Sequence, residues 1–353
     1  MTVSRTSLSR TSLLMLTVCG GFVLAAAPRA SAQDLYVSDF DSSQILEYTQ
    51  AGTLARTFSA NGLFVSPDGL LLAGGSLYVS AQDSTTGNGS IYQYNLSNPT
   101  AAPTLFASDP GGVLSGLAFS GGNLYAADSQ NGKIVVFNGQ TGTQTGSFGS
   151  GGSNPLVSPI GLAFENGSLY VADSGADDVL KYNDSGTSHS VFVATGSGGL
   201  QSPGDITFDT SGNLLVASGQ GASNGGSLDR FSASGSPDPA VGNAGAVFAS
   251  DPGLLNPYGV AISPMGAVFV GDRNSNNSNG SGGGGHFDEF NADGTFAESF
   301  AFNGGNGNPY GLAFGPASGP AAVPEVSTQI SFGLLLALGL CAVRRRRHVK
   351  CAI

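Results

Sequence analysis

The chain has 353 residues, 55 of them Gly, and only 10% of its residues are charged. Eight of the 13 Lys and Arg lie near the two ends, so residues 33–343 hold five of them against all 24 Asp and Glu, a net charge of −19. This acidic middle argues against nucleic acid as a partner, because it repels phosphate. Cys19, Cys341 and Cys351 all lie near the ends, so the middle has no disulfide and no thiol chemistry.

The first 32 residues have the features of a signal peptide. Arg5 and Arg10 precede an apolar run at residues 13–27, and Ala30 and Ala32 fit a small-residue cleavage site. We therefore expect residues 1–32 to be removed on export and the mature chain to begin at Gln33. An uncleaved anchor is the alternative, and the apolar run is short for a membrane span.

Residues 33–314 contain six copies of one unit. An apolar triplet of the form Leu35-Tyr36-Val37 recurs with its centre at residues 36, 78, 125, 170, 215 and 269. A Gly-rich turn and another apolar segment precede each later triplet, and two further apolar segments follow each one. Four short strands per copy, joined by tight turns, predict an all-β six-bladed β-propeller with four-stranded antiparallel blades.

The expected strands are the following. First strands cover 69–72, 116–119, 161–164, 205–208, 259–262 and 311–314, and second strands are the apolar triplets. Third strands cover 45–48, 91–94, 134–137, 179–182, 228–231 and 287–290. Fourth strands cover 53–58, 104–107, 145–148, 191–194, 246–249 and 296–300. The first copy lacks a first strand and the last first strand stands alone, so we expect the two to pair and close the ring.

One copy is especially regular. It reads Pro159-Ile160-Gly161-Leu162-Ala163-Phe164, then Gly167-Ser168-Leu169-Tyr170-Val171-Ala172-Asp173-Ser174, then Val179-Leu180-Lys181-Tyr182. This unit resembles the NHL repeat, over residues 34 to 314. The resemblance implies the propeller fold and leaves function open, because NHL-like propellers include binding platforms, lyases, lactonases and scaffolds.

The C-terminal segment has three parts after a linker at 315–322. They are a motif around Pro324 and Glu325, an apolar stretch at 326–343, and the cluster Arg344, Arg345, Arg346 and Arg347. The apolar stretch predicts a transmembrane helix whose Arg end stays in the cytoplasm. Residues 323–350 resemble the PEP-CTERM sorting signal of Gram-negative bacteria, with Val326 in place of the family's second Pro. This implies an exosortase-like processing enzyme and delivery to the cell envelope or extracellular matrix; a plain membrane anchor is the alternative.

One face of the predicted propeller carries the longer loops. Loops before first strands and between second and third strands share this face, which we call the looped face, and they include 82–90, 219–227 and 273–285. Turns on the opposite face, the turn face, are short, as at 120–123. We therefore expect a ligand to meet the looped face and the mouth of the central channel.

Residues just before the first strands lie at this channel mouth. They include Asp68, Ser115, Tyr258 and Tyr310, with Asp205 one position further on. Lactonase-like propellers carry Asn or Asp metal ligands there, but Asp68 and Asp205 alone fall short of the roughly six to eight oxygens that Ca²⁺ takes. We expect no cofactor; Ca²⁺ or another divalent cation belongs to an enzyme alternative. Tyr258 and Tyr310 form either a platform for a sugar or apolar ligand, or a plug.

A second acidic set recurs along the chain. Asp39, Asp128, Asp173 and Asp272 end second strands at equivalent positions, either as a Ca²⁺-binding ring or as caps of backbone N–H groups. Repetition in four of six copies favours caps. His286 stands without a second His nearby in the sequence, and no catalytic motif is present.

These observations favour a non-enzymatic envelope or matrix propeller that binds an extracellular protein or polysaccharide. The first alternative is a metal-dependent lactonase-like or lyase-like enzyme using Asp68 and Asp205. The second is a structural spacer in the matrix.

Overall fold

The computed structural model describes residues 33–316 except 153, 220–224, 274–284 and 303–306. Contacts divide the chain into Met1–Ala30 and Ser31–Ile353, and all described residues belong to the second unit. The expected signal peptide at 1–32, the sorting signal at 323–350 and its transmembrane segment at 326–343 lie outside the described residues. Within the described residues, no helix is long and apolar enough to cross a membrane.

The described residues form six antiparallel sheets, which we number as blades in chain order. Blade 1 contains β25 (Pro309–Pro316), β1 (Gln33–Asp39), β2 (Gln44–Tyr48) and β3 (Leu54–Ser59). Blade 2 contains β4 (Phe64–Val65), β5 (Leu70–Ala73), β6 (Ser76–Asp83), β7 (Gly89–Asn95) and β8 (Thr104–Asp109). Blade 3 contains β9 (Leu114–Ser120), β10 (Asn123–Asp128), β11 (Lys133–Asn138) and β12 (Gln144–Phe148).

The remaining three blades follow the same order. Blade 4 contains β13 (Pro159–Glu165), β14 (Ser168–Asp173), β15 (Asp178–Asn183) and β16 (His189–Val193). Blade 5 contains β17 (Ile206–Phe208), β18 (Leu214–Ser218), β19 (Ser227–Phe231) and β20 (Val247–Ala249), preceded by a short 3₁₀ helix, η1 (Ser197–Gly199). Blade 6 contains β21 (Pro257–Ile262), β22 (Val268–Asp272), β23 (His286–Phe290) and β24 (Phe296–Ala301).

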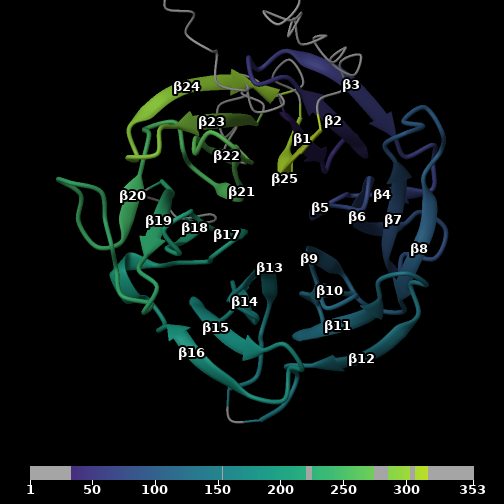
Figure 1. The fold of residues 1–353 in the computed structure, drawn as a ribbon, viewed down its shortest axis with the longest axis horizontal. Coiled ribbons are helices and arrows are strands. Elements are labelled where there is room, and N and C mark those ends of the chain that lie inside the picture. Colours follow the sequence, from purple (N-terminus) through teal and green to yellow (C-terminus); the bar gives the residue numbers. More distant parts are fainter. Residues whose placement is uncertain (1–32, 153, 220–224, 274–284, 303–306, 317–353) are drawn as a thin grey trace, which may run out of the picture. The chain divides into compact units, whose positions relative to one another are not determined.

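The blades surround a central axis, with the first strand of each innermost and the fourth outermost (Figure 1). The expected ring closure is confirmed: β25 pairs with β1, with Leu35 opposite Phe314 and Val37 opposite Leu312. β25 runs through Pro316, two residues beyond the expected strand. Closure covers the inner edge of β1 and makes β25 the innermost strand of blade 1, so this blade has four strands.

Hydrophobic side chains pack between the blades. Each of six buried clusters joins one pair of neighbouring blades. Leu35 and Val37 pack toward blade 6, whereas Tyr36 between them packs toward blade 2. Successive strand residues point to opposite faces of a sheet, and both faces of a blade are covered by neighbours. This is why the second strands are apolar at three consecutive positions instead of alternating.

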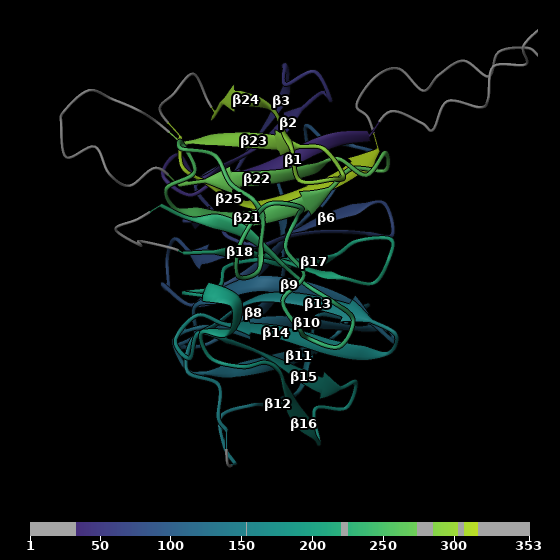
Figure 2. The same cartoon turned by 90° about the vertical axis from the view of Figure 1, so that its left-hand side faces the viewer.

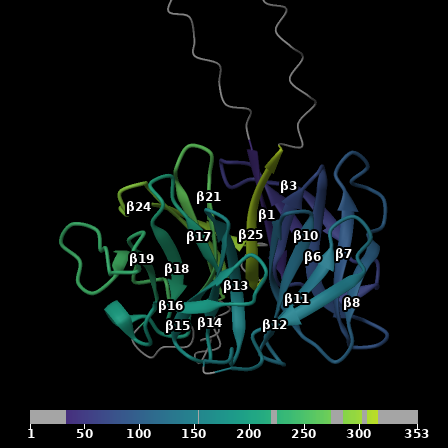
Figure 3. The same ribbon diagram turned by 60° about the horizontal axis from the view of Figure 1, so that its bottom comes forward.

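The direction in which each strand runs determines on which face of the ring the loops at its two ends lie. The strands run between the two faces of the ring, as the side view shows (Figure 2). First strands start at the looped face and end at the turn face, and second strands return. β1 starts at Gln33, which pairs with Pro316 at the end of β25, and the two strands lie side by side (Figure 3). Both terminal strands therefore leave the described structure at the turn face.

One strand was not expected. Phe64 and Val65 form β4, which pairs with the looped-face end of β6 through Asp83 and Gln82. Blade 2 thus has its innermost strand split between β4 and β5, on either side of Pro67. Pro lacks a backbone N–H and interrupts the ladder there.

Candidate functional site

The candidate site lies at the looped-face end of the channel. It is formed by the mouth cluster, which we define as Asp68, Ser115, Asp205, Tyr258, Tyr310 and Arg273. Five of these six residues were expected from their position before or at the start of first strands, and the structure brings all five together. Arg273 was missed, although it directly follows Asp272 at the end of β22 and is one of five basic residues in the middle of the chain.

Serine hydroxyls fix the backbone at the mouth. Ser38 Oγ accepts a hydrogen bond from the N–H of Gly311 at 2.7 Å and donates to the carbonyl of Asp68 at 2.6 Å. Ser80 Oγ likewise accepts from the Gly69 N–H at 2.8 Å and donates to the Ser115 carbonyl. Each hydroxyl joins the first strand of one blade to the mouth residue of the next, so Asp68 and Ser115 are held in position.

The Asp68 carboxyl is the hub of the cluster. Its Oδ2 accepts a hydrogen bond from Tyr258 Oη at 3.0 Å, and a second side-chain hydrogen bond joins it to Ser115. Tyr258 belongs to blade 6, Asp68 to blade 2 and Ser115 to blade 3. Because Tyr258 reaches past blade 1 to Asp68, these bonds cross the channel mouth.

Arg273 packs between the two tyrosines. Its guanidinium lies 4.2 Å from the ring centroid of Tyr258 and 4.7 Å from that of Tyr310, and Nη1 donates to Tyr310 Oη at 2.9 Å. The Tyr258 and Tyr310 rings are 4.5 Å apart, and Phe40 stacks on Tyr310 at 4.4 Å. Cation–π and aromatic contacts of this kind stabilise desolvated groups. These contacts leave Tyr258 buried, and its role as a ligand platform or as a plug stays a prediction.

Two carboxyl groups in the cluster titrate near neutral pH. Burial raises the pKa of Asp68 to about 6, opposed by its hydrogen bonds to Tyr258 and Ser115 and by Arg273. Burial also raises the pKa of Asp205 to about 7, with the charge of Asp68 adding to the shift and backbone N–H bonds opposing it. The site thus combines two weakly acidic carboxyls and one guanidinium, and it suits cationic or hydrogen-bond-donating groups.

The recurring Asp residues cap backbone N–H groups. Asp173 accepts from the N–H groups of Val157 at 2.7 Å, Ser158 at 2.8 Å and Gly175 at 3.1 Å. Asp39, Asp128 and Asp272 make the same kind of bond to the loop before the first strand of their own blade. The expected cap within the residue's own turn is confirmed for Asp39, Asp128 and Asp173, and all four Asp residues also cap a second loop. Across the described ranges, no group of three or more His, Cys, Asp or Glu is arranged to hold a metal.

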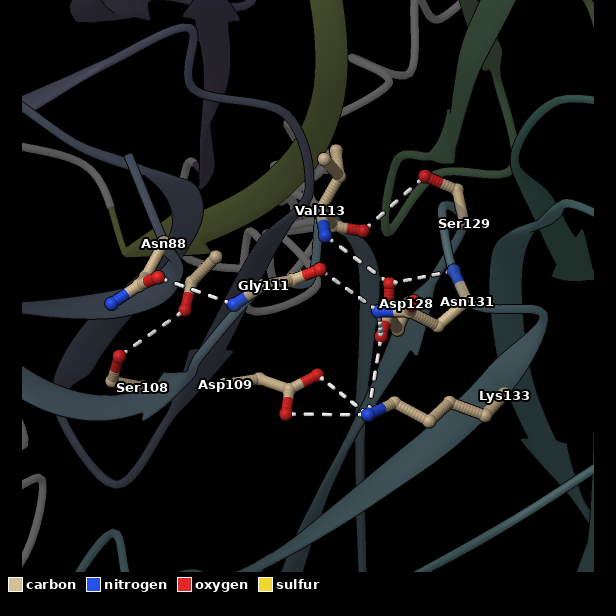
Figure 4. Close-up of polar contacts among 10 residues, drawn as sticks. Asn88, Ser108, Asp109, Gly111, Val113, Asp128, Ser129, Asn131 and Lys133 are labelled. Carbon is tan, nitrogen blue, oxygen red and sulfur yellow. Dashed lines mark hydrogen bonds and ion pairs between the residues drawn. The ribbon is translucent and has the colours of Figure 1, made fainter. Parts of the chain in front are cut away.

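Figure 4 shows one of these caps joined to an ion-pair network. Asp128 Oδ1 accepts from the Val113 N–H at 3.1 Å and the Asn131 N–H at 3.2 Å. Lys133 Nζ lies 3.3 Å from Asp128 Oδ2 and 3.1 Å from Asp109 Oδ2. Burial raises the pKa of Asp109, whose charge competes with that of Asp128 for one lysine. The network ties the outer strand of blade 2 to blade 3 at the looped face.

No protein-family model matches this chain, and no curated protein matches it. Solved structures share its fold. A chain from a Nidogen/Laminin complex is similar with a TM-score of 0.61 at 19% identity, covering 80% of this chain and 98% of that chain. A protein of unknown function from Bacteroides caccae is similar with a TM-score of 0.60 at 12% identity, covering 80% and 99%. At these identities the likeness shows the six-bladed propeller fold and nothing finer.

Proposed function

We propose that this protein is an exported propeller, held at the cell envelope through its C-terminal segment, that binds an extracellular protein or polysaccharide on its looped face. The proposal takes residues 1–32 as the signal peptide and residues 323–350 as the PEP-CTERM-like signal read by an exosortase-like enzyme. It takes the blades as NHL-like repeats on the motif of residues 159–182. The location is the outer surface or matrix of a Gram-negative bacterium.

The observation that carries this proposal is the position of the terminal strands. β25 ends, and β1 begins, at the turn face, where Gln33 pairs with Pro316. A tail that starts at residue 317 therefore departs from the turn face. A propeller held by this tail presents its looped face away from the attachment, toward partners outside the cell.

Exposed apolar residues on the looped face support a binding role. Val157, in the loop before β13, is 56% exposed, and Val65, in β4, is 40% exposed. A partner that binds this face would bury apolar surface at both positions. The similar chain in the Nidogen/Laminin complex comes from an assembly of two proteins, as its description states.

The second candidate function is the metal-dependent enzyme that uses Asp68 and Asp205. The proximity of the two carboxyls favours it. It ranks below the binding platform because the Asp68 carboxyl already accepts hydrogen bonds from Tyr258 and Ser115, and a cation would have to displace them.

Matched substitutions on the two faces test the binding platform. Val157→Lys places a charge in the looped face, and Met265→Lys places the same charge in an 80% exposed position of the turn face. We expect Val157→Lys to weaken binding of the protein to envelope and matrix material of its host by about tenfold, since a charge opposes apolar burial. Met265→Lys should leave binding unchanged in the same sedimentation assay. Equal binding by both variants, or loss confined to Met265→Lys, would reject the looped face as the binding surface.

A further inference from the structure

A cavity of about 400 Å³ lies along the channel, and it is separate from the mouth cluster except for Asp205. Its walls come from the first strands of all six blades. Gln33 at the start of β1 and the exposed Pro264 in the turn after β21 also line it. The cavity therefore reaches solvent at the turn face, and its volume is within the range of small-molecule sites.

One residue breaks the symmetry of the ring at the inner end of this cavity. Five first strands carry Gly at equivalent positions: Gly69, Gly116, Gly161, Gly259 and Gly311. A Cβ atom at Gly161 would lie 2.6 Å from the carbonyl oxygen of Gly204, and the other four meet a neighbouring carbonyl at still shorter range. Packing thus favours the absence of a side chain. Blade 5 has Asp205 there instead, and such departures from a local rule concentrate at functional sites.

The Asp205 carboxyl is held in a defined orientation. Oδ1 accepts a hydrogen bond from the Ile206 N–H at 2.9 Å, and the carboxyl also accepts from the Val260 N–H of the neighbouring blade. The Asp205 N–H donates to the Tyr258 carbonyl at 2.7 Å. An ionised carboxylate offers about four acceptor sites, so two bonds leave it able to accept more from the cavity that it lines.

The remaining lining favours a ligand that donates hydrogen bonds. Among the described residues that line the cavity, Asp205 is the one with an ionisable side chain, and Thr207 adds a hydroxyl. Each first strand pairs with a neighbour on its outer side, so its inner edge presents peptide carbonyls as well as N–H groups toward the channel. The nearby Asp68 adds negative potential. The carboxyl groups of Asp205 and Asp68, when ionised, attract cations and repel anions.

We propose that this cavity binds a small organic cation with N–H donors, a primary ammonium or a guanidinium, which enters from the turn face and pairs with the Asp205 carboxylate. At about 30 Å³ per water-sized group, the cavity holds on the order of ten non-hydrogen atoms. The inference is independent of the binding proposed for the looped face.

Titration of the full chain with butylammonium and methylguanidinium, followed by calorimetry and ligand-observed NMR, tests the proposal. Tetramethylammonium is the control ligand, because it carries the charge without an N–H donor. We expect saturable binding of the first two compounds to the wild-type protein and at least about tenfold weaker binding of the control. Asp205→Gly, which restores the residue of the other five blades, should lose binding by a similar factor. Asp184→Gly, on the same face but outside the cavity lining, should retain it.

Three outcomes would overturn this site. They are equal binding to the Asp205→Gly and Asp184→Gly proteins, equal binding of tetramethylammonium, and absence of saturable binding to the wild-type protein, in which case the cavity holds water only. Thermal melts of both variants confirm that they fold. Attachment of Asp205→Gly to envelope material, measured alongside, separates failure of this site from failure of the looped-face proposal.

Discussion

Gly259→Ala is expected to lower the free energy of unfolding by about 3 kcal/mol. A Cβ atom there would overlap the backbone carbonyl of Tyr310 and lie 2.7 Å from Leu312 Cδ1. Both belong to β25, the strand that closes the ring against blade 6. A backbone oxygen has no rotamer to adopt, so the two first strands must separate and the packing around Leu312 must loosen.

Chemical denaturation measures this effect, with Gly146→Ala as the matched control. Gly146 lies in the outer strand β12, and an added Cβ would have no heavy atom within 4 Å. Since Ala restricts the unfolded chain more than Gly does, the control should be neutral or slightly stabilising. If both variants lost a similar free energy of unfolding, the close packing of the first strands around the channel would not be the cause of the loss in Gly259→Ala.

Asp205→Gly is expected to stabilise the protein by about 2 kcal/mol at about pH 8, and by much less at about pH 5. Burial raises the pKa of Asp205 to about 7 in the native state, whereas an unfolded Asp releases its proton near its ordinary pKa of about 3.9. The native state therefore retains a proton that the unfolded state has lost. The free energy of unfolding of the wild-type protein therefore falls as the pH rises between these two pKa values. The variant has no carboxyl at this position, so its stability does not fall for this reason.

The expected stabilisation of Asp205→Gly is reduced by two effects. Gly costs about 1 kcal/mol of backbone entropy, and the Val260 N–H loses its acceptor. Unfolding curves at the two pH values measure the difference, with Asp184→Gly, an exposed Asp on the turn face, as control. A variant less stable than the wild-type protein at about pH 8, or a pH-independent difference, would contradict the assignment of a weakly acidic carboxyl to Asp205.

Most of the fold could be predicted from the sequence because each copy of the repeat has an apolar strand that must be buried on both faces. Apolar triplets such as Leu169-Tyr170-Val171 need neighbours on both faces, and only the adjacent blades supply them. The isolated strand at 311–314 predicted closure because an unpaired inner edge is unfavourable. β4 was missed because Phe64 and Val65 are two residues cut off from β5 by Pro67, and so short a strand leaves no periodic pattern.

The site was predicted in part for a related reason. The position of a residue within the repeat determines where its backbone lies in a blade, so the residues just before the first strands could be placed at the channel mouth. It does not fix where a long side chain points, and Arg273 therefore went unrecognised although its guanidinium packs against both Tyr258 and Tyr310. The cavity was missed because loop length directed attention to the looped face, whereas Asp205 lines a space that opens on the turn face.

Thiol labelling of intact host cells tests the central claim, that the attached propeller presents its looped face outward. In a background with Cys19, Cys341 and Cys351 replaced by Ser, single cysteines are placed by Val157→Cys on the looped face and Met265→Cys on the turn face, both at exposed positions. A bulky, membrane-impermeant maleimide should label cell-associated Val157→Cys protein rapidly and Met265→Cys protein slowly, with equal labelling after denaturation. Faster labelling of the turn face, or equal rates on intact cells, would contradict the account.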